Sequence, residues 1–330
     1  MNTQYRPGAV LMAVLAVVAV AACGSKQTTG GRTDAAPRTN TGASSRGNAT
    51  ADEVAREARG KVKCPARVAT PARAASAPVD DVVGVRPGMT YEEAAHTVLC
   101  SDDLLVVSDS ISRGINLQTY GQTIRQGFTA RPAEPRVEKS SKQIMQEMQD
   151  AAMARGGNRI VRDMQPGQTK WYVGTMGVPG AERVINVARE EWFAADRNPV
   201  IGTVEQALKD KYGEPTRQQR SNGSVYLTWG YDPMGRRITE TSRLYNRCAG
   251  VADPDGGTNY SPDCGLVIAA VVWPLRENPQ LAEFMQVGVI DQAGGYQAIE
   301  QTEQALQAEN AARQARQVQD ASKNAATPQL

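Results

Sequence analysis

The chain has 330 residues, of which 37 are Lys or Arg, 35 are Asp or Glu and one is His. The formal net charge of +2 argues against nucleic acid as a partner, because binding nucleic acid needs a concentrated basic face. A single histidine leaves little material for general catalysis, and nucleophile, phosphate-binding and metalloprotease motifs are missing from the sequence, so we expect neither an enzyme nor a cofactor.

The first feature along the chain is a short apolar run at residues 9–22, which follows Arg6. Its 14 residues are too few to cross the hydrocarbon core of a membrane, which takes about 20 residues of helix. A charge, a short apolar run and small residues before a cleavage site are typical of a secretory signal peptide. We therefore expect residues 1–22 to be a signal peptide.

The run ends in the letters VAAC at residues 20–23, which resemble the lipobox of bacterial lipoproteins. The resemblance implies that a lipid is attached to Cys23, which becomes the first residue of the mature chain. Gly and Ser follow the cysteine, and in this the sequence resembles lipoproteins that are sorted to the outer membrane. The folded part is therefore expected to face the periplasm. The alternative is an ordinary signal peptide cut near Ala22.

The segment after Cys23 is predicted as a flexible linker. Between residues 24 and 50, alanine is the only apolar residue among Gly, Ser, Thr, Asn and Arg. Such a chain buries too little surface to offset the entropy lost on ordering. We assign residues 23–80 to the lipid anchor and the linker.

Four more cysteines follow, and an even number in an exported protein favours disulfides. Four cysteines allow three pairings, and separation along the chain favours Cys64 with Cys100 and Cys248 with Cys264. A zinc site is the alternative, but the sequence has no Cys-x-x-Cys pair and its one histidine is His96. We therefore expect two disulfides and no metal site.

A faint internal repeat predicts two helices, at residues 88–100 and 202–213. Both stretches begin with Gly and contain Thr-x-Glu followed by Glu or Gln and then Ala. The spacing of a capping box occurs in both: Thr90 with Glu93, and Thr203 with Gln206. The second helix should end at Gly213, because glycine with a proline close behind is a typical helix end.

Strand-like runs dominate residues 158–295. Alternation at residues 224–232 places Val225, Leu227, Trp229 and Tyr231 on one face, as in a half-buried strand. The runs TKWYVGTMG and ERVINVAREEWF flank a turn signal and should pair as a hairpin, and GLVIAAVVW and AEFMQVGVI supply two more strands. These five strands predict an α+β fold with an antiparallel sheet and packed helices.

The organisation predicted from these patterns is two related modules, a small N-terminal α/β module at residues 81–138 and an α+β domain at residues 158–295. Between them, residues 139–157 form an amphipathic helix that should pack against the sheet or bridge the modules. Residues 296–330 are a polar helical tail, partly disordered. From about Thr302 this tail has few large apolar residues, so we expect it to add little to the core and to be either an exposed helix or a partner-binding arm.

The Gly-Met-Thr-x-x-x-Ala opening at residue 88, and its echo at residue 202 followed by Tyr-Gly-Glu-Pro and a Trp/Tyr strand, resemble the SmpA/OmlA family of small lipoproteins. That family attaches to the outer membrane and serves as an accessory to barrel-protein assembly, with a helix pair packed on a three-stranded antiparallel sheet. The resemblance implies similar layers here. This chain differs in its greater length, its cysteines and its long C-terminal tail.

Two further groups could carry chemistry. His96 and Cys100 are four residues apart on one helix face and could form a thiol dyad, but a cysteine in a disulfide is not a nucleophile. A calcium loop is the other hypothesis, for four residues whose spacing lacks the required order: Asp253, Asp255, Asn259 and Asp263. Neither group is predicted to be a site.

All four tryptophans lie in predicted strands: Trp171, Trp192, Trp229 and Trp273. Aromatic residues in strands mostly fill cores, and the alternative is a platform for sugar stacking. Two functions follow as expectations. The first is a lipid-anchored, non-enzymatic protein-binding or assembly factor that binds another envelope protein. The alternative is a lipoprotein that captures cell-wall glycan or a small molecule on an aromatic-bearing sheet.

Overall fold

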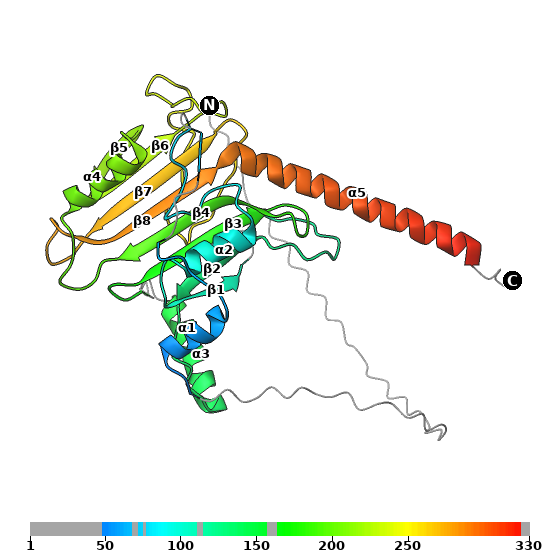
Figure 1. Cartoon of the computed structure of the whole chain (residues 1–330), viewed down its shortest axis with the longest axis horizontal. Coiled ribbons are helices and arrows are strands. Elements are labelled where there is room, and N and C mark those ends of the chain that lie inside the picture. The colour runs from blue at the N-terminus through cyan, green and yellow to red at the C-terminus, as the bar shows by residue number, and fades with distance from the viewer. Residues whose placement is uncertain (1–47, 68–71, 75–76, 111–114, 157–163, 325–330) are drawn as a thin grey trace, which may run out of the picture. The chain divides into compact units, whose positions relative to one another are not determined.

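The computed structural model describes residues 48–67, 72–74, 77–110, 115–156 and 164–324 (Figure 1). Among these residues, none of the helices is both long and apolar enough to cross a bilayer. The helices and strands follow in this order: α1 (Ala51–Arg59), α2 (Tyr91–Leu99), β1 (Leu105–Asp109), β2 (Gly127–Pro132), α3 (Ser141–Gly156), β3 (Thr169–Met176), β4 (Arg183–Trp192), α4 (Ile201–Tyr212), β5 (Arg217–Ser221), β6 (Ser224–Gly230), β7 (Leu266–Pro274), β8 (Ala282–Asp291) and α5 (Gln292–Asn324).

One antiparallel sheet organises the described part of the chain, with its eight strands in the order β1-β2-β3-β4-β8-β7-β6-β5. Together with the helices, the sheet confirms the predicted α+β class. The predicted hairpin of β3 and β4 is present, with Trp171 opposite Arg189. Strands β1 and β2 come from residues 81–138 and the other strands from residues 158–295, so the two predicted modules contribute to a single sheet.

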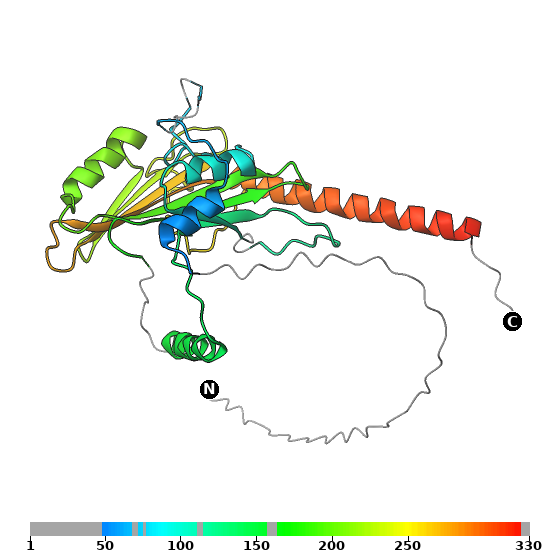
Figure 2. The same cartoon turned by 60° about the horizontal axis from the view of Figure 1, so that its bottom comes forward.

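Helices α2 and α4 cover one face of the sheet, which we call the helix face (Figure 2). The alternation in β6 points Val225, Leu227 and Trp229 toward this face, where each is at most 1% exposed, as predicted. Tyr231 packs against the same core. Burial of these apolar side chains between the sheet and the two helices forms the main hydrophobic core.

The opposite face, which we call the loop face, carries irregular chain and the beginning of α5. The segment 231–265 contains the second disulfide and packs on Val267 of β7. The segment 115–124 and α5 pack on Ile185 of β4. Since Val267 and Ile185 point away from the helix-face core, the sheet is buried on both sides over much of its area.

Capping boxes begin the first two helices. In α2 the backbone N–H of Glu93 donates to Thr90 Oγ1 at 3.1 Å and the Glu93 carboxylate accepts from the Thr90 N–H at 2.8 Å, which confirms the predicted cap. The same arrangement of Thr50 and Glu53 begins α1. Helix α1 lies within residues 23–80, so the assignment of that whole range to a flexible linker is wrong.

The predicted capping box of α4 is wrong, because the helix begins at Ile201, two residues before Thr203, with Val200 as the N-cap. Sheet pairing fixes this start. Val200 bridges to Leu281, and the Ile201 N–H donates to the Gln280 carbonyl oxygen at 3.0 Å. The predicted end of the helix at its C-cap glycine is confirmed.

Helix α3 does not bury the apolar residues at its start. Ile144 and Met148, on the apolar side of this helix, are 48% and 65% exposed. The alternative that the helix packs against the sheet through these residues is therefore wrong, and the alternative that it bridges the modules stays a prediction. Residues 157–163, which follow it, lie outside the described part of the chain.

Helix α5 packs on the loop face further along its length than the sequence predicted. Thr302 is 2% exposed and Leu306 is fully buried in a cluster with Leu117, Met176 and Ile185. Further on, the Arg313 guanidinium donates to the Tyr120 carbonyl oxygen at 3.0 Å. The prediction that residues from Thr302 onward add little to the core is wrong.

Candidate functional site

The four tryptophans divide into two groups by position. Trp171 and Trp229 are each 1% exposed and belong to the core of the helix face. The indole N–H of Trp229 donates to the Gly213 carbonyl oxygen at 2.7 Å, which ties β6 to the end of α4. For these two residues the core interpretation is correct, and they are closed to any ligand.

Trp192 and Trp273 belong instead to an aromatic row across one end of the loop face, on four neighbouring strands. Phe284 lies between the two indoles, stacked on Trp192 with ring centroids 4.6 Å apart and on Trp273 at 5.6 Å. Tyr226 meets Trp273 edge to face at 6.2 Å. Both faces of the Phe284 ring are covered by the neighbouring indoles. A ligand can therefore contact the edge of this ring but not its face.

A buried ion pair adjoins the aromatic row. Lys170 and Glu190 are 6% and 4% exposed, and Lys170 Nζ lies 3.4 Å from Glu190 Oε1. The Glu190 carboxylate also accepts hydrogen bonds from the Trp192 indole N–H and the Gln286 amide, each at 2.6 Å. Because each oxygen has a donor, the two buried charges are compensated and their side chains are held in one geometry.

The segment 231–265 forms a wall above the row. Asp255 in this segment pairs with Lys170 at 2.7 Å and with Arg131 of β2 at 2.9 Å. The backbone of the segment lies directly on β8, since a Cβ at Gly288 would come within 2.0 Å of the Val251 carbonyl oxygen. Only glycine at this position allows such a close approach.

Between the wall and the row lies a cleft of about 740 Å³, within the range of about 300–1,000 Å³ typical of ligand sites. A trough of about 160 Å³, which Gly250 and Ala252 help to line, shares Tyr226 with the cleft. The buried indole N–H of Trp273 has no acceptor within the described residues. The rim is polar: Ser221, Asn222, Asp253, Asp255, Arg276 and Glu283.

The acidic residues considered as a calcium loop serve other contacts. Asp253 accepts a hydrogen bond from the backbone N–H of Asp255 at 2.9 Å, and Asp263 pairs with Arg247 at 2.8 Å. No cluster of three or more His, Cys, Asp or Glu suited to a metal occurs among the residues that the structure describes. The disulfide between Cys248 and Cys264, with Cα atoms 5.5 Å apart, closes the segment that carries these acids.

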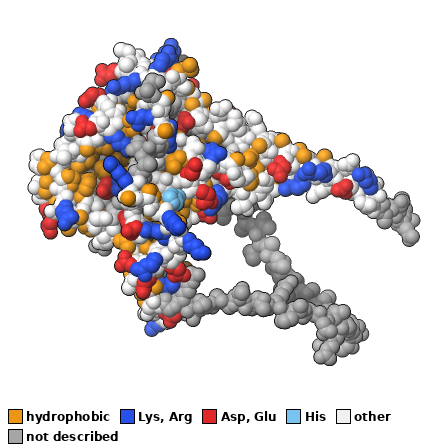
Figure 3. All heavy atoms as spheres, viewed as in Figure 1, with side chains coloured by type: hydrophobic (Ala, Val, Ile, Leu, Met, Phe, Trp, Pro, Cys, Tyr) orange, Lys and Arg blue, Asp and Glu red, His pale blue; other side chains and the backbone are white. Residues whose placement is uncertain are grey.

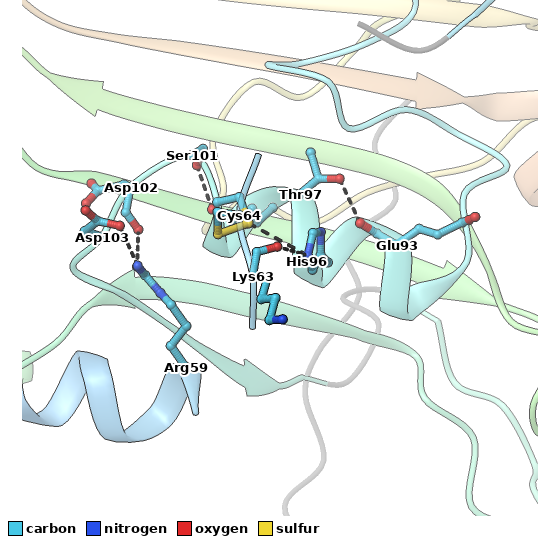
Figure 4. Close-up of a disulfide and its surroundings, with 11 residues drawn as sticks. Arg59, Lys63, Cys64, Glu93, His96, Thr97, Ser101, Asp102 and Asp103 are labelled. Carbon is cyan, nitrogen blue, oxygen red and sulfur yellow. Dashed lines mark hydrogen bonds and ion pairs between the residues drawn. A yellow bond between two sulfur atoms is a disulfide. The ribbon is translucent and has the colours of Figure 1, made fainter. Parts of the chain in front are cut away.

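The other disulfide joins Cys64, after α1, to Cys100 at the end of α2, with Cα atoms 5.2 Å apart (Figure 4). These are the two pairs expected from sequence separation. His96 Nε2 lies 4.0 Å from Cys100 Sγ and 3.0 Å from the Lys63 carbonyl oxygen. The sequence placed His96 beside Cys100 correctly, but this cysteine is not a free thiol here. Arg59, at the end of α1, makes a second contact with the chain after α2 by donating to the Asp102 carbonyl oxygen.

The sequence did not predict that the buried ion pair and the aromatic row lie together in one site. The one local signal was a lysine and a glutamate inside the two strands of the predicted hairpin, Lys170 and Glu190. The predicted lipid site, Cys23, lies outside the described residues.

Comparisons with known proteins give no relative. No protein family, curated protein or solved structure matches the chain. The resemblance to the SmpA/OmlA family stays a prediction from short motifs, and the sheet here has more strands than that family's three.

Proposed function

We propose that the protein is a non-enzymatic protein-binding factor of the bacterial cell envelope, tethered to the outer membrane through Cys23. The cleft on the loop face is its binding site, and its ligand is a segment of another envelope protein. The observation that carries this proposal is the combination, in one cleft, of aromatic edges, a polar rim and an indole N–H without an acceptor among the described residues.

The chemistry of the cleft favours a polypeptide over a sugar. Sugars bind aromatic residues through open ring faces, whereas Phe284 is covered on both sides by Trp192 and Trp273. Tyr, Trp and Phe are enriched at protein interfaces, where ring edges and a few hydrogen-bonding groups suffice. The glycan alternative is therefore less well supported.

The charges of the rim favour a basic segment. The rim carries the carboxylates of Asp253 and Glu283 against the guanidinium of Arg276, while the carboxylate of Asp255 is already paired with Lys170 and Arg131. Complementary charge raises the rate of encounter and excludes partners of the wrong sign. The binding segment is expected to place Lys or Arg side chains beside these carboxylates.

The test is photo-crosslinking in intact cells with benzoyl-phenylalanine at Tyr226, which lines both the cleft and the trough. The matched control carries the same group at Gln206, an exposed position on α4 on the other face of the sheet. We expect one discrete envelope protein to be captured from Tyr226 and not from Gln206. Glu283→Lys should reduce this capture.

Equal capture from both positions, or capture from Tyr226 that Glu283→Lys leaves unchanged, would overturn the proposal. Circular dichroism of each variant establishes that the sheet is intact. Glu283 is half-buried at the rim and belongs to neither hydrophobic cluster of the loop face, so its replacement should not unfold the protein.

A further inference from the structure

A second hollow lies on the helix face, between α4 and the turn at residues 81–85. It is a groove of about 390 Å³. Figure 3 shows hydrophobic side chains gathered on this face beside α4. The floor and walls are mainly apolar: Phe193, Pro199, Val204, Leu208, Met285 and Val287. This groove shares no lining residue with the cleft on the loop face.

The charged residues that line the groove, within the described chain, are both cations, Arg189 and Lys211. Lys211 Nζ lies 3.0 Å from Asp81 Oδ2, and its side chain is 36% exposed. Arg189 donates to Glu191 at 2.6 Å, while its buried Nε has no acceptor among the residues described. The guanidinium also lies over the Trp171 ring, 5.4 Å from its centroid, so Arg189 brings a positive charge to the wall of the groove.

The two cations lie toward the same end of the groove, around Tyr212. This tyrosine directly follows Lys211, and its hydroxyl donates to the Asp81 carbonyl oxygen at 2.9 Å. Burial raises the pKa of Tyr212 above its ordinary value, the charge of Asp81 adds to the rise, and the charge of Arg189 opposes it. Arg189 is therefore within electrostatic range of the tyrosine, and the rest of the floor is uncharged.

The wall opposite α4 is preformed. Val83 lines the groove with φ of 45°, a left-handed conformation that is costly for a β-branched residue. The turn is held by a bridge between Val82 and Val85 and by the Gly84 N–H, which donates to Asp81 Oδ2 at 3.0 Å. Strained turns that the surrounding structure holds in place are found at ligand sites.

We infer that this groove binds a free long-chain fatty acid, with its hydrocarbon chain along the apolar floor and its carboxylate at Arg189 and Lys211. The cationic end matches a carboxylate, and the floor matches a chain without polar groups. The volume is at the low end of the range of about 300–1,000 Å³ for ligand sites, which suits one chain better than the two chains of a phospholipid.

The test uses the full chain with Cys23→Ser, which carries no lipid of its own, and titrates it with the fluorescent fatty acid cis-parinaric acid. We expect saturable binding to a single site. The methyl ester, which lacks the charge, should bind about tenfold more weakly, as should the acid to Lys211→Gln, in line with the loss of one charge contact.

Two substitutions on α4 separate the groove from the rest of the helix. Ala207 is exposed and lines the groove, so Ala207→Trp should fill it and abolish binding. Gln206→Trp, at the neighbouring exposed position outside the groove, should bind as the parent does. If thermal melting shows Ala207→Trp to be unfolded, Thr203→Trp, which lines the groove at the other end of the helix, replaces it.

Several outcomes would overturn the inference: no binding by the parent, equal binding of acid and ester, or full binding by a folded variant with a filled groove. Crosslinking from Tyr226 is unaffected by any of them, so failure here and failure of the proposed function are distinguishable.

Discussion

Lys170 and Glu190 lie opposite each other on β3 and β4, with Nζ and Oε1 3.4 Å apart and both side chains almost fully removed from solvent. Lys170→Met would leave the Glu190 carboxylate buried without its cation. We predict that the free energy of unfolding falls by about 3–5 kcal/mol, measured by urea denaturation.

The matched control for this prediction is Lys139→Met, which breaks an ion pair with Glu147 whose side chains are 42% and 56% exposed. Because exposed pairs contribute about 0–1 kcal/mol, this variant should stay within that range. Adding Glu190→Gln to Lys170→Met should recover part of the loss. Strict additivity of the two substitutions would show that the two charges do not stabilise each other.

Leu306 marks how far α5 belongs to the core. Leu306→Ala should lower the free energy of unfolding by about 2–5 kcal/mol, because a fully buried leucine leaves a cavity beside Leu117 and Met176. Val318→Ala, at a position 70% exposed on the same helix, should change it by less than about 0.5 kcal/mol. Equal effects of the two variants in thermal melting would contradict the packing of α5.

The second disulfide holds the wall of the cleft. Replacing Cys248 and Cys264 together by Ala should cost about 3 kcal/mol of stability, the value for closing a loop of this length. It should also weaken crosslinking from Tyr226, because the segment that carries Asp255 would loosen. The control replaces Cys64 and Cys100, neither of which lines the cleft or belongs to its wall, and should leave crosslinking from Tyr226 unchanged.

Glu205 makes the attachment of α4 to β5 sensitive to acid. Burial alone would raise the pKa of Glu205, but hydrogen bonds from Lys209 and Gln218 and the charge of Arg220 outweigh it and hold the pKa below the ordinary 4.5. A lowered folded-state pKa stabilises the protein above pH 4.5, and this contribution is lost as the pH falls through the folded-state value. Glu205→Gln should therefore lose stability less steeply below pH 4.5 in urea denaturation, and an unchanged profile would refute the assignment.

Cys23 carries the proposed membrane attachment. Cys23→Ala should release the protein from the membrane fraction or leave the precursor uncleaved, because a single lipid-modified residue is the anchor that the sequence offers. Cell fractionation with immunoblotting measures the first outcome. Mass spectrometry that finds an unlipidated mature N-terminus in the native protein would refute the lipid site.

The sequence predicted those parts of the fold whose pattern is local. Val225, Leu227 and Trp229 alternate with polar residues and therefore identified β6, and Thr90 with Glu93 identified the start of α2. Strand β5 was not predicted because its sequence, RQQRS, contains no apolar residue and so shows no alternation. It is an edge strand paired on one side, and Gln218 is satisfied by a hydrogen bond to Glu205 of α4 instead of by burial.

The rest depended on distant parts of the chain. The start of α4 is set by pairing of Val200 with Leu281, which no spacing within the helix reveals. The cleft is similar, because Trp192, Phe284 and Trp273 come together through strand order and not through any motif. A polar helix such as α5 also conceals its contacts, because its buried residues, among them Thr302 and Leu306, are few and separated by polar ones.

The strand order also has a consequence for how the chain is made. Strand β8 lies between β4 and β7, although it is the last strand in the sequence. Strands β1 to β4 and β5 to β7 can each pair during synthesis, but they leave the edges of β4 and β7 open until Ala282–Asp291 emerges. Exposed edges of this kind invite pairing with other chains. The nascent protein is therefore most vulnerable to aggregation just before its final strand is available, and both halves of the sheet join in a single late step.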